Sequence, residues 1–258
     1  MKVLATDFDG TFYTGEACVP GNLAAVERWR KAGNVFGIVT GRPFQMILPE
    51  LRRHNISVDF LVCDNGAALH DGAGNPIWSA VFDPEIPGAV FDLPELENII
   101  YYVAATRSGL AAHTQDNSDP YWDDVCNLGR RSKEKMQELS EVIQISTLFE
   151  GPEEAQAFAK QLDSRFPGKI VTHVNWRCCD SVPFGLDKAQ GILRLAELKG
   201  WDRRDIFTMG DGCNDVPMLK AFASAAPVSS EKAVLDVVSR TFESVAAYID
   251  ALLEETGK

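Results

Sequence analysis

The sequence predicts an α/β protein, a doubly wound parallel sheet interrupted by a smaller α/β insert. Three observations support this fold class. Short apolar segments alternate with helical patterns over the first eighty residues and again after residue 184. Each of these segments is apolar throughout, as in parallel strands that helices cover on both faces. Between these two stretches the alternating pattern is lost, and a proline-containing segment lies at each end of the interruption.

The first part of the core is expected to alternate strand and helix. Leu23, Val26 and Trp29 recur at helical spacing after the first strand, and Gly33 ends that helix. The segments VFGIVT and FLVC are short apolar runs that read as strands. The predicted elements are a strand over 1–6, a helix over 21–32, a strand over 35–40, a helix over 44–53 and a strand over 60–63.

The insert is expected to follow a hairpin and a proline-rich connection. NGAALHDGAGNPIW predicts a hairpin around residues 71–74, and three prolines follow between Pro84 and Pro94. We therefore assign 1–82 and 184–258 to the core and 83–183 to the insert. The insert is predicted to contain helices over 95–107, 130–139 and 152–165, and strands over 109–114, 142–148, 169–175 and 177–182.

The core pattern resumes after the segment Pro183-Phe184-Gly185. A helix, an apolar strand of sequence IFTM and a further helix follow in turn. The predicted elements are a helix over 188–198, a strand over 206–209, a helix over 215–222, a strand over 225–228 and a helix over 245–253.

Composition and charge exclude some partners. The chain has 258 residues, of which 45% are hydrophobic and 24% charged, as in a globular protein with a substantial core. A net charge of −12 argues against nucleic-acid and anionic-membrane partners, which favour basic surfaces. Residues 83–183 hold 17 acidic against 9 basic residues, and the rest hold 20 against 16. The more acidic middle part is consistent with a separate domain.

The sequence also predicts the compartment. No run of 18 apolar residues occurs, and the apolar stretch before Asp7 is too short for the core of a signal peptide. The six cysteines form no CxxC pair, which favours reduced, structural thiols. We therefore expect a cytoplasmic protein without a membrane span. Its oligomeric state is left open.

Polar residues follow several predicted core strands. In open parallel sheets, ligands bind beyond the carboxyl ends of the strands, where these residues should gather. Carboxylates, a hydroxyl and an ammonium group at one edge suit a divalent cation together with a phosphoryl group. The segments are Asp7-Phe8-Asp9-Gly10-Thr11, Thr40-Gly41-Arg42, Lys188 at the start of a helix, and Gly210-Asp211-Gly212-Cys213-Asn214-Asp215.

The spacing of Asp7 and Asp9 raises a physical question. Residues two apart on a strand point to the same side, so these carboxylates should lie close together and repel. A bound cation would make this crowding tolerable.

The motifs DFDGT, TGR, the spaced lysine and GDGCND occur in this order. The set resembles the haloacid dehalogenase superfamily of aspartate-nucleophile phosphatases. The position of the insert resembles the type-IIB cap of the Cof-like branch. The resemblance implies a Rossmann-like core that performs the chemistry and a cap that selects the substrate by closing over it.

The resemblance also implies roles for individual residues. Asp7 would attack phosphorus and form an aspartyl-phosphate, and Asp9 would act as acid and then base. Mg²⁺ would be bound by the side chains of Asp7 and Asp211 and by the backbone carbonyl of Asp9. Asp215 and Asn214 would orient Lys188 or a metal-bound water. The phosphate would be bound by Thr40 and Lys188 and by the segments at Asp9, Gly10 and Gly41.

Other residues near the motifs are expected to have lesser roles. Arg42 is interpreted as structural, capping or pairing near the strand ends, and Asn65-Gly66 should lie at the same edge without a catalytic role. Phe8 and Phe12 stand where the branch usually has leucine, and AFASAAPVSS over 221–230 replaces a glycine-rich segment. Cap residues that could reach the substrate are His113, Trp122, Arg130, Arg131, Trp176 and Arg177.

The predicted function is a Mg²⁺-dependent phosphomonoester hydrolase that acts on a small phosphorylated metabolite, most simply a sugar phosphate. A phosphomutase of the same superfamily is one alternative. A catalytically idle binding or regulatory protein and a purely structural metal site are the others. Neither a binding protein nor a structural metal site would need an acid–base residue such as Asp9.

Overall fold

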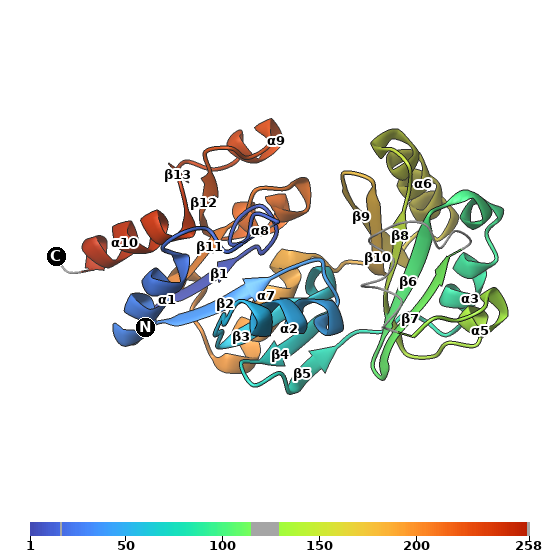
Figure 1. Ribbon diagram of the computed structural model, residues 1–258, viewed down its shortest axis with the longest axis horizontal. Coiled ribbons are helices and arrows are strands. Elements are labelled where there is room, and N and C mark those ends of the chain that lie inside the picture. The colour runs from blue at the N-terminus through green and yellow to red at the C-terminus, as the bar shows by residue number, and fades with distance from the viewer. Residues whose placement is uncertain (16, 115–128, 257–258) are drawn as a thin grey trace. The chain divides into compact units, whose positions relative to one another are not determined.

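The computed structural model describes residues 1–15, 17–114 and 129–256, and Figure 1 shows its elements. The chain forms two compact units. The first comprises Met1–Trp78 and Asp187–Lys258, and the second comprises Ser79–Leu186. These divisions lie within a few residues of the sequence-derived positions 82/83 and 183/184.

An eight-stranded sheet forms the centre of the first unit, with the order β13-β12-β11-β1-β2-β3-β4-β5. The strands from β13 to β3 are parallel, and β4 pairs antiparallel with β3. β1 therefore lies between β11 and β2, although β11 is distant in sequence. The strands are β1 (Val3–Thr6), β2 (Val35–Val39), β3 (Phe60–Cys63), β4 (Ala68–Asp71), β5 (Pro76–Ser79), β11 (Ile206–Met209), β12 (Ala223–Pro227) and β13 (Thr241–Phe242).

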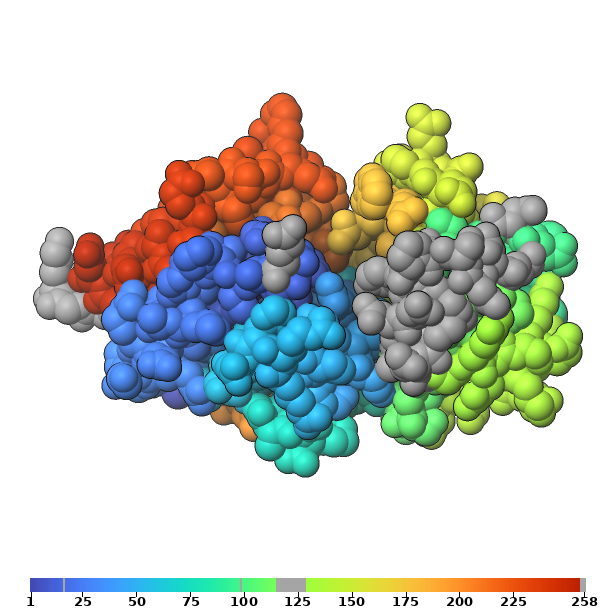
Figure 2. Space-filling model, in the orientation of Figure 1, coloured from blue at the N-terminus to red at the C-terminus, as the bar shows by residue number. Residues whose placement is uncertain are grey.

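Helices bury apolar side chains against this sheet. Ile192 of α7 and Leu219 of α8 belong to one buried cluster with Val3 of β1. Figures 1 and 2 both show α10 beside α1, and the buried indole of Trp29 in α1 donates to the carbonyl of Val35 at 2.8 Å. The helices are α1 (Asn22–Lys31), α2 (Phe44–Arg53), α7 (Lys188–Lys199), α8 (Val216–Ala221), α9 (Lys232–Leu235) and α10 (Val245–Thr256). The predicted α/β class with a parallel core sheet is confirmed.

The second unit is built on an antiparallel sheet of order β7-β6-β8-β10-β9. Alternate strand residues such as Tyr102 and Ile145 pack with helix residues such as Phe91 and Phe158 in one core. The elements are α3 (Glu85–Phe91), β6 (Tyr101–Thr106), β7 (Gly109–Thr114), α5 (Lys133–Gln137), β8 (Val142–Leu148), α6 (Pro152–Arg165), β9 (Ile170–Asn175) and β10 (Cys178–Pro183).

Two predictions for the second unit were wrong. The segment 95–107 is not a helix: a 3₁₀ turn over Pro94–Asn98 precedes strand β6. All six residues of β6 are buried between β7 and β8, and their aromatic and β-branched side chains suit a sheet. The proline-rich stretch is also not a plain connection. It contains α3, in which Pro87 is tolerated in the first turn because its missing N–H would have no partner within the helix.

Two findings bear on the chemistry of the chain. Within the described residues, no helix is both long and apolar enough to cross a membrane. Cys18, Cys63, Cys178, Cys179 and Cys213 are free thiols, and Cys126 lies outside the described residues.

Candidate active site

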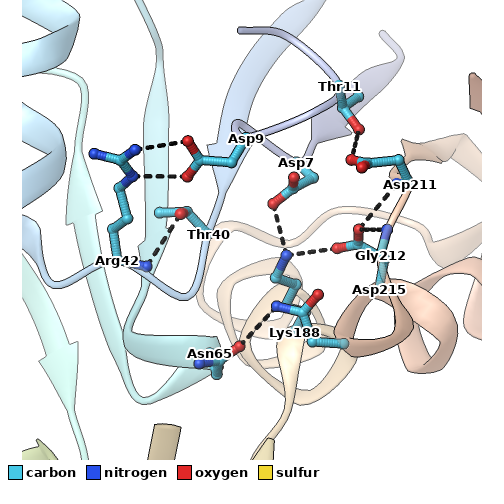
Figure 3. Close-up of polar contacts among 11 residues, drawn as sticks. Asp7, Asp9, Thr11, Thr40, Arg42, Asn65, Lys188, Asp211, Gly212 and Asp215 are labelled. Atoms are coloured by element: carbon cyan, nitrogen blue, oxygen red, sulfur yellow. Dashed lines mark hydrogen bonds and ion pairs between the residues drawn. The ribbon is translucent and has the colours of Figure 1, made fainter. Parts of the chain in front are cut away.

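The predicted site residues of the core gather at the carboxyl ends of adjacent strands. The backbone N–H of Asp7 extends the β1–β11 pairing by donating to the carbonyl of Met209 at 2.8 Å. Thr40 follows β2 and donates its N–H to the carbonyl of Val62 in β3. Because β1 lies between β11 and β2, residues more than 200 positions apart meet at this edge (Figure 3).

Lys188 is the centre of the site. Its Nζ lies 2.6 Å from Oδ1 of Asp7 and 2.5 Å from Oδ1 of Asp215, and its side chain is only 1% exposed. Burial alone would lower the pKa of the Lys188 ammonium, but the carboxylates of Asp215 and Asp7 outweigh it, so the pKa lies above its ordinary value. Lys188 therefore stays charged and links two carboxylates from different strand ends.

The start of α7 reaches this position through close backbone contacts. Asp187 caps the helix by accepting the N–H of Gln190 at 2.8 Å. Gly66 has a φ of +97°, and a Cβ there would lie 2.0 Å from the carbonyl oxygen of Asp187. A Cβ on Gly191 would lie 2.6 Å from Cα of Gly66. These two glycines are needed because the helix packs directly on the turn after β3, which brings Lys188 to the strand ends.

The Asn65-Gly66 segment does lie at this edge. Asn65 is buried, and its backbone N–H donates to the carbonyl of Thr40 at 3.2 Å. Its side-chain oxygen accepts from the amide of Asn214 at 3.3 Å. Asn214 thus contacts a neighbouring loop in this structure rather than Lys188.

Asp211 is held by a residue to which the sequence reasoning assigned no role. The hydroxyl of Thr11 donates to Oδ1 of Asp211 at 2.6 Å. Burial raises the pKa of Asp211 to about 6, with Asp215 adding to the rise and the Thr11 hydrogen bond opposing it. The signal for Thr11 was present in DFDGT, as the hydroxyl two residues after the second aspartate.

Gly10 allows Asp211 to approach the loop after β1. Its φ is +80°, and a Cβ there would lie 2.2 Å from Oδ2 of Asp211. The N–H of Gly10 donates to the carbonyl of Tyr13 at 2.8 Å, because residues 8–13 fold back on themselves. In this conformation the Gly10 N–H is therefore engaged within the loop, whereas the sequence reasoning expected it to bind phosphate.

Asp215 is fully buried and uses both carboxylate oxygens. Oδ1 accepts from Lys188, and Oδ2 accepts the backbone N–H groups of Asp211 and Gly212, each at 3.0 Å. Asp215 thus ties the position of Lys188 to the loop that carries Asp211. The orienting role expected for Asp215 stays a prediction.

The carboxylates at the site could hold a metal ion. Asp7, Asp211 and Asp215 each offer one oxygen, and these three oxygens lie within 4.8 Å of one another. Burial, followed by the charge of Asp215, raises the pKa of Asp7 well above its ordinary value despite the opposing Lys188. The buried carboxylates of Asp7 and Asp215 and the half-buried one of Asp211, with one ammonium, leave excess negative charge. A divalent cation with a preference for oxygen ligands, such as Mg²⁺, would neutralise it. The residues present therefore fit this metal.

Asp9 does not crowd Asp7 as expected. Its carboxylate points away from Asp7 and forms two bonds with Arg42: Oδ2 to Nε at 2.7 Å and Oδ1 to Nη2 at 2.6 Å (Figure 3). Asp9 also makes the smallest contribution to the raised pKa of Asp7. The reason is that β1 ends at Thr6, so the two-residue alternation of a strand no longer applies. The Asp9 side chain is therefore paired, and Arg42 is its partner.

Thr40 and Gly41 form the turn that leads to Arg42. The buried hydroxyl oxygen of Thr40 accepts the backbone N–H of Arg42 at 3.1 Å. The segment 221–230 ends beside the site as well, since the N–H of Glu231 donates to the carbonyl of Asp211 at 3.3 Å. The substituted segment can thus influence the loop that carries Asp211.

The proposed substrate-contacting residues of the second unit are placed as follows. Nδ1 of His113 lies 2.9 Å from the carbonyl oxygen of Arg131. Trp176 is 68% exposed, and the guanidinium of Arg177 lies 5.0 Å from the centre of its ring. Arg130 is exposed, and Trp122 lies outside the described residues.

Together, fold and site define a class of α/β enzyme in which a buried lysine and carboxylates that could hold a cation share one edge of a parallel sheet. The model of the haloacid dehalogenase-like hydrolase family matches residues 4–245. The chain belongs to this family, which confirms the resemblance seen in its motifs.

Similar proteins agree with this assignment. The chain is 24% identical to the 5-amino-6-(5-phospho-D-ribitylamino)uracil phosphatase YwtE of Bacillus subtilis, over 98% of both chains. It is 23% identical to the pyridoxal phosphate phosphatase YbhA of Escherichia coli, over 96% of this chain and 97% of that protein. The family and these relatives confirm the predicted enzyme class, a phosphoric monoester hydrolase.

Solved structures support the fold. A sugar phosphatase of haloacid dehalogenase subclass IIB superposes with a TM-score of 0.82 at 21% identity, over 99% of both chains. A haloacid dehalogenase-like hydrolase from B. subtilis superposes with a TM-score of 0.85 at 19% identity, over 98% of this chain and all of that one. At these identities the likeness shows a shared fold.

Proposed function

We propose that the protein is a Mg²⁺-dependent phosphomonoester hydrolase that acts through an aspartyl-phosphate on a small phosphorylated metabolite. One observation carries this proposal: buried Lys188 bridges Asp7 and Asp215, with Asp211 within reach of the same cation. A carboxylate that is held in place and charge-balanced in this way suits attack on an anionic phosphoryl group.

In the first step, an oxygen of Asp7 forms a bond to phosphorus while the bond from phosphorus to the leaving oxygen breaks. Asp9 gives its proton to that oxygen, so the alcohol leaves neutral. In the second step, water attacks the aspartyl-phosphate and gives a proton to Asp9. Asp7 is regenerated, and inorganic phosphate is released. Dividing one difficult displacement into two easier ones is the benefit of the covalent intermediate.

Lys188 serves both steps by opposing the rise in the pKa of Asp7 that burial causes, which favours the carboxylate form of the nucleophile. Its ammonium can also contact a phosphoryl oxygen, as can the hydroxyl of Thr40. Asp215 positions Lys188, because it binds that ammonium and two backbone N–H groups at once.

The metal would be held by the side chains of Asp7 and Asp211 and by the backbone carbonyl of Asp9. The bonds from Lys188 and Thr11 involve one oxygen of each carboxylate. When bound, Mg²⁺ would neutralise the site and stabilise charge on the transferring phosphoryl group. Asp215 is proposed to remain an orienting residue, since both of its oxygens are engaged.

The proposed substrate is a sugar phosphate or a metabolite of similar size, and the second unit is proposed to serve as the selecting cap. The relatives named above act on a phosphoribitylamino-uracil and on pyridoxal phosphate, and a structural neighbour is a sugar phosphatase. The acidic residues of the second unit disfavour a substrate with many negative charges. We expect the enzyme to act in the cytoplasm, where its free thiols would stay reduced.

The test is hydrolysis of p-nitrophenyl phosphate with and without Mg²⁺. We expect activity with Mg²⁺, loss with EDTA, and loss in Asp7→Asn, with Asp92→Asn as a control because Asp92 lies outside the site. Undiminished hydrolysis by Asp7→Asn would refute the nucleophile. A panel containing glucose 6-phosphate, pyridoxal 5′-phosphate and glycerol 3-phosphate would then identify the substrate class.

A further inference from the structure

The carboxylate of Asp9 is held by a set of contacts that fix its direction. Both of its oxygens are bonded to one guanidinium, through Nε and Nη2 of Arg42. Such a two-bond arrangement sets the plane of the carboxylate as well as its position, which a single bond would not do. Asp9 and Arg42 are partly exposed, at 41% and 25%, so the pair is accessible to a ligand.

The backbone of Arg42 is also fixed on both sides. Its N–H donates to the hydroxyl oxygen of Thr40 at 3.1 Å, and its carbonyl accepts the N–H of Asp64 at 3.2 Å. Arg42 therefore projects from a turn that is bonded to the ends of β2 and β3. The guanidinium is anchored to the sheet edge that also carries the nucleophile.

An aromatic ring also contacts the guanidinium. The guanidinium carbon of Arg42 lies 5.6 Å from the ring centre of Phe8, within the range of a cation–π contact. Phe8 is fully buried and stacks on Tyr13, with ring centres 5.1 Å apart and planes 7° apart. Phe8 lies between Asp7 and Asp9 in the sequence, so the ring that supports Arg42 belongs to the loop that carries both aspartates.

We propose that Arg42, supported by the ring of Phe8, is a positioning residue for Asp9. It holds the ionised Asp9 carboxylate apart from Asp7 and Asp211, so that Asp9 does not turn toward the cation as an additional ligand. When Asp9 is protonated, one bond of the fork opens and the freed O–H faces the leaving oxygen. Arg42 thereby determines how well the enzyme cleaves esters whose alcohol needs a proton. This inference rests on the proposed function, in which Asp9 protonates that alcohol.

The role predicts a defect that depends on the leaving group. p-Nitrophenolate leaves readily without a proton, whereas phenolate and alkoxides depend on the acid. The quantity to measure is kcat/KM, because it reports the first chemical step and not the later hydrolysis of the aspartyl-phosphate, which all esters share. A general acid typically contributes about 10²–10⁴-fold, so a misaligned one should cost a measurable part of this.

The main variant is Arg42→Lys, which keeps the positive charge but cannot form the two-bond fork. We expect kcat/KM for phenyl phosphate to fall at least about tenfold, and that for p-nitrophenyl phosphate to fall less than about threefold. Arg204→Lys is the matched control, because Arg204 forms a similar fork with Asp202 at an exposed position outside the site. The control should change neither value.

Two further variants test whether Arg42 acts by positioning Asp9 or only by stabilising the fold. In Arg42→Ala, added guanidinium at millimolar concentration should restore hydrolysis of phenyl phosphate more than that of p-nitrophenyl phosphate. Phe8→Leu keeps the ion pair but removes the ring, and should shift the ratio of the two substrates in the same direction by a smaller factor. An unchanged ratio in Phe8→Leu, with an unaltered melting temperature, would overturn the part assigned to the ring.

The outcomes distinguish this inference from the proposed function. If Asp9→Asn shows the selective loss and Arg42→Lys hydrolyses both esters as the wild type does, the positioning role of Arg42 is overturned and the proposed function stands. An equal loss on both esters in Arg42→Lys would indicate a structural role and would also overturn it. Absence of hydrolysis by the wild-type protein would overturn both.

Discussion

Replacing Lys188 with methionine tests the electrostatic reasoning most directly. The ammonium lies 2.6 Å from Oδ1 of Asp7 and 2.5 Å from Oδ1 of Asp215, and all three side chains are buried. Methionine fills a similar volume but leaves two buried carboxylates without their cation. Removing one partner of a buried ion pair typically costs about 3–5 kcal/mol, because the remaining charge stays desolvated. This is a large part of the stability of an ordinary domain.

The assay is urea unfolding followed by circular dichroism in a buffer with EDTA. Lys199→Met is the matched control, since it removes an exposed lysine from the other end of the same helix and should cost less than about 1 kcal/mol. Mg²⁺ should restore part of the stability of Lys188→Met, because a cation at Asp7 and Asp211 would replace some of the lost positive charge. A Lys188→Met protein as stable as Lys199→Met in EDTA would refute the reasoning.

The same variant has a predictable pH dependence. Burial holds the pKa of Asp7 above its value in the unfolded chain even in the presence of Lys188. Without Lys188, the folded state should bind a proton at Asp7 still more strongly than the unfolded state does. Stability that comes from a raised carboxyl pKa is present at low pH and is lost as pH rises. The deficit of Lys188→Met should therefore be larger at pH 8 than at pH 5.

Two further predictions concern Asp211. Gly10→Ala should lower the melting temperature and weaken Mg²⁺ binding, because the new Cβ would lie 2.2 Å from Oδ2 of Asp211. Gly15→Ala is the control for backbone strain alone, since Gly15 also has a positive φ but open space around it. Equal effects of the two substitutions would contradict the clash with Asp211. Burial raises the pKa of Asp211 to about 6 in the absence of metal, so protons compete with Mg²⁺ below about that pH. Calorimetry should therefore find tighter Mg²⁺ binding at pH 8 than at pH 5. Equal affinity at the two pH values would argue against Asp211 as a ligand.

The catalytic core could be predicted well because its signals are local and repeated. Each buried strand is a short apolar run, and each motif directly follows such a run, as Asp7 follows β1 and Asp211 closely follows β11. In the second unit the local signal was misleading. Residues 101–106 form a strand because β7 and β8 pair with its two edges, and β8 comes from residues far along the chain.

Which side chains bond to one another was harder to predict than where each side chain lies. The sequence placed Asp7 and Asp9 side by side, but the chain leaves strand geometry after Thr6 and sends the Asp9 carboxylate to Arg42. Thr11 was visible in the first motif, yet its bond to Asp211 joins residues 200 positions apart. Such contacts depend on loop directions and strand order, which short motifs do not contain.

By itself, the sequence determined the class of fold, the family and the residues that meet at the strand ends. Apolar periodicity and motif order are properties of neighbouring residues, so a single chain displays them. The burial of Lys188 between Asp7 and Asp215 and the pairing of Arg42 with Asp9 depend on how the distant elements pack. These pairings arise because the strand order places β1 between β11 and β2, and α7 packs on Gly66. The ion pairs of the site therefore join residues that lie far apart in the sequence.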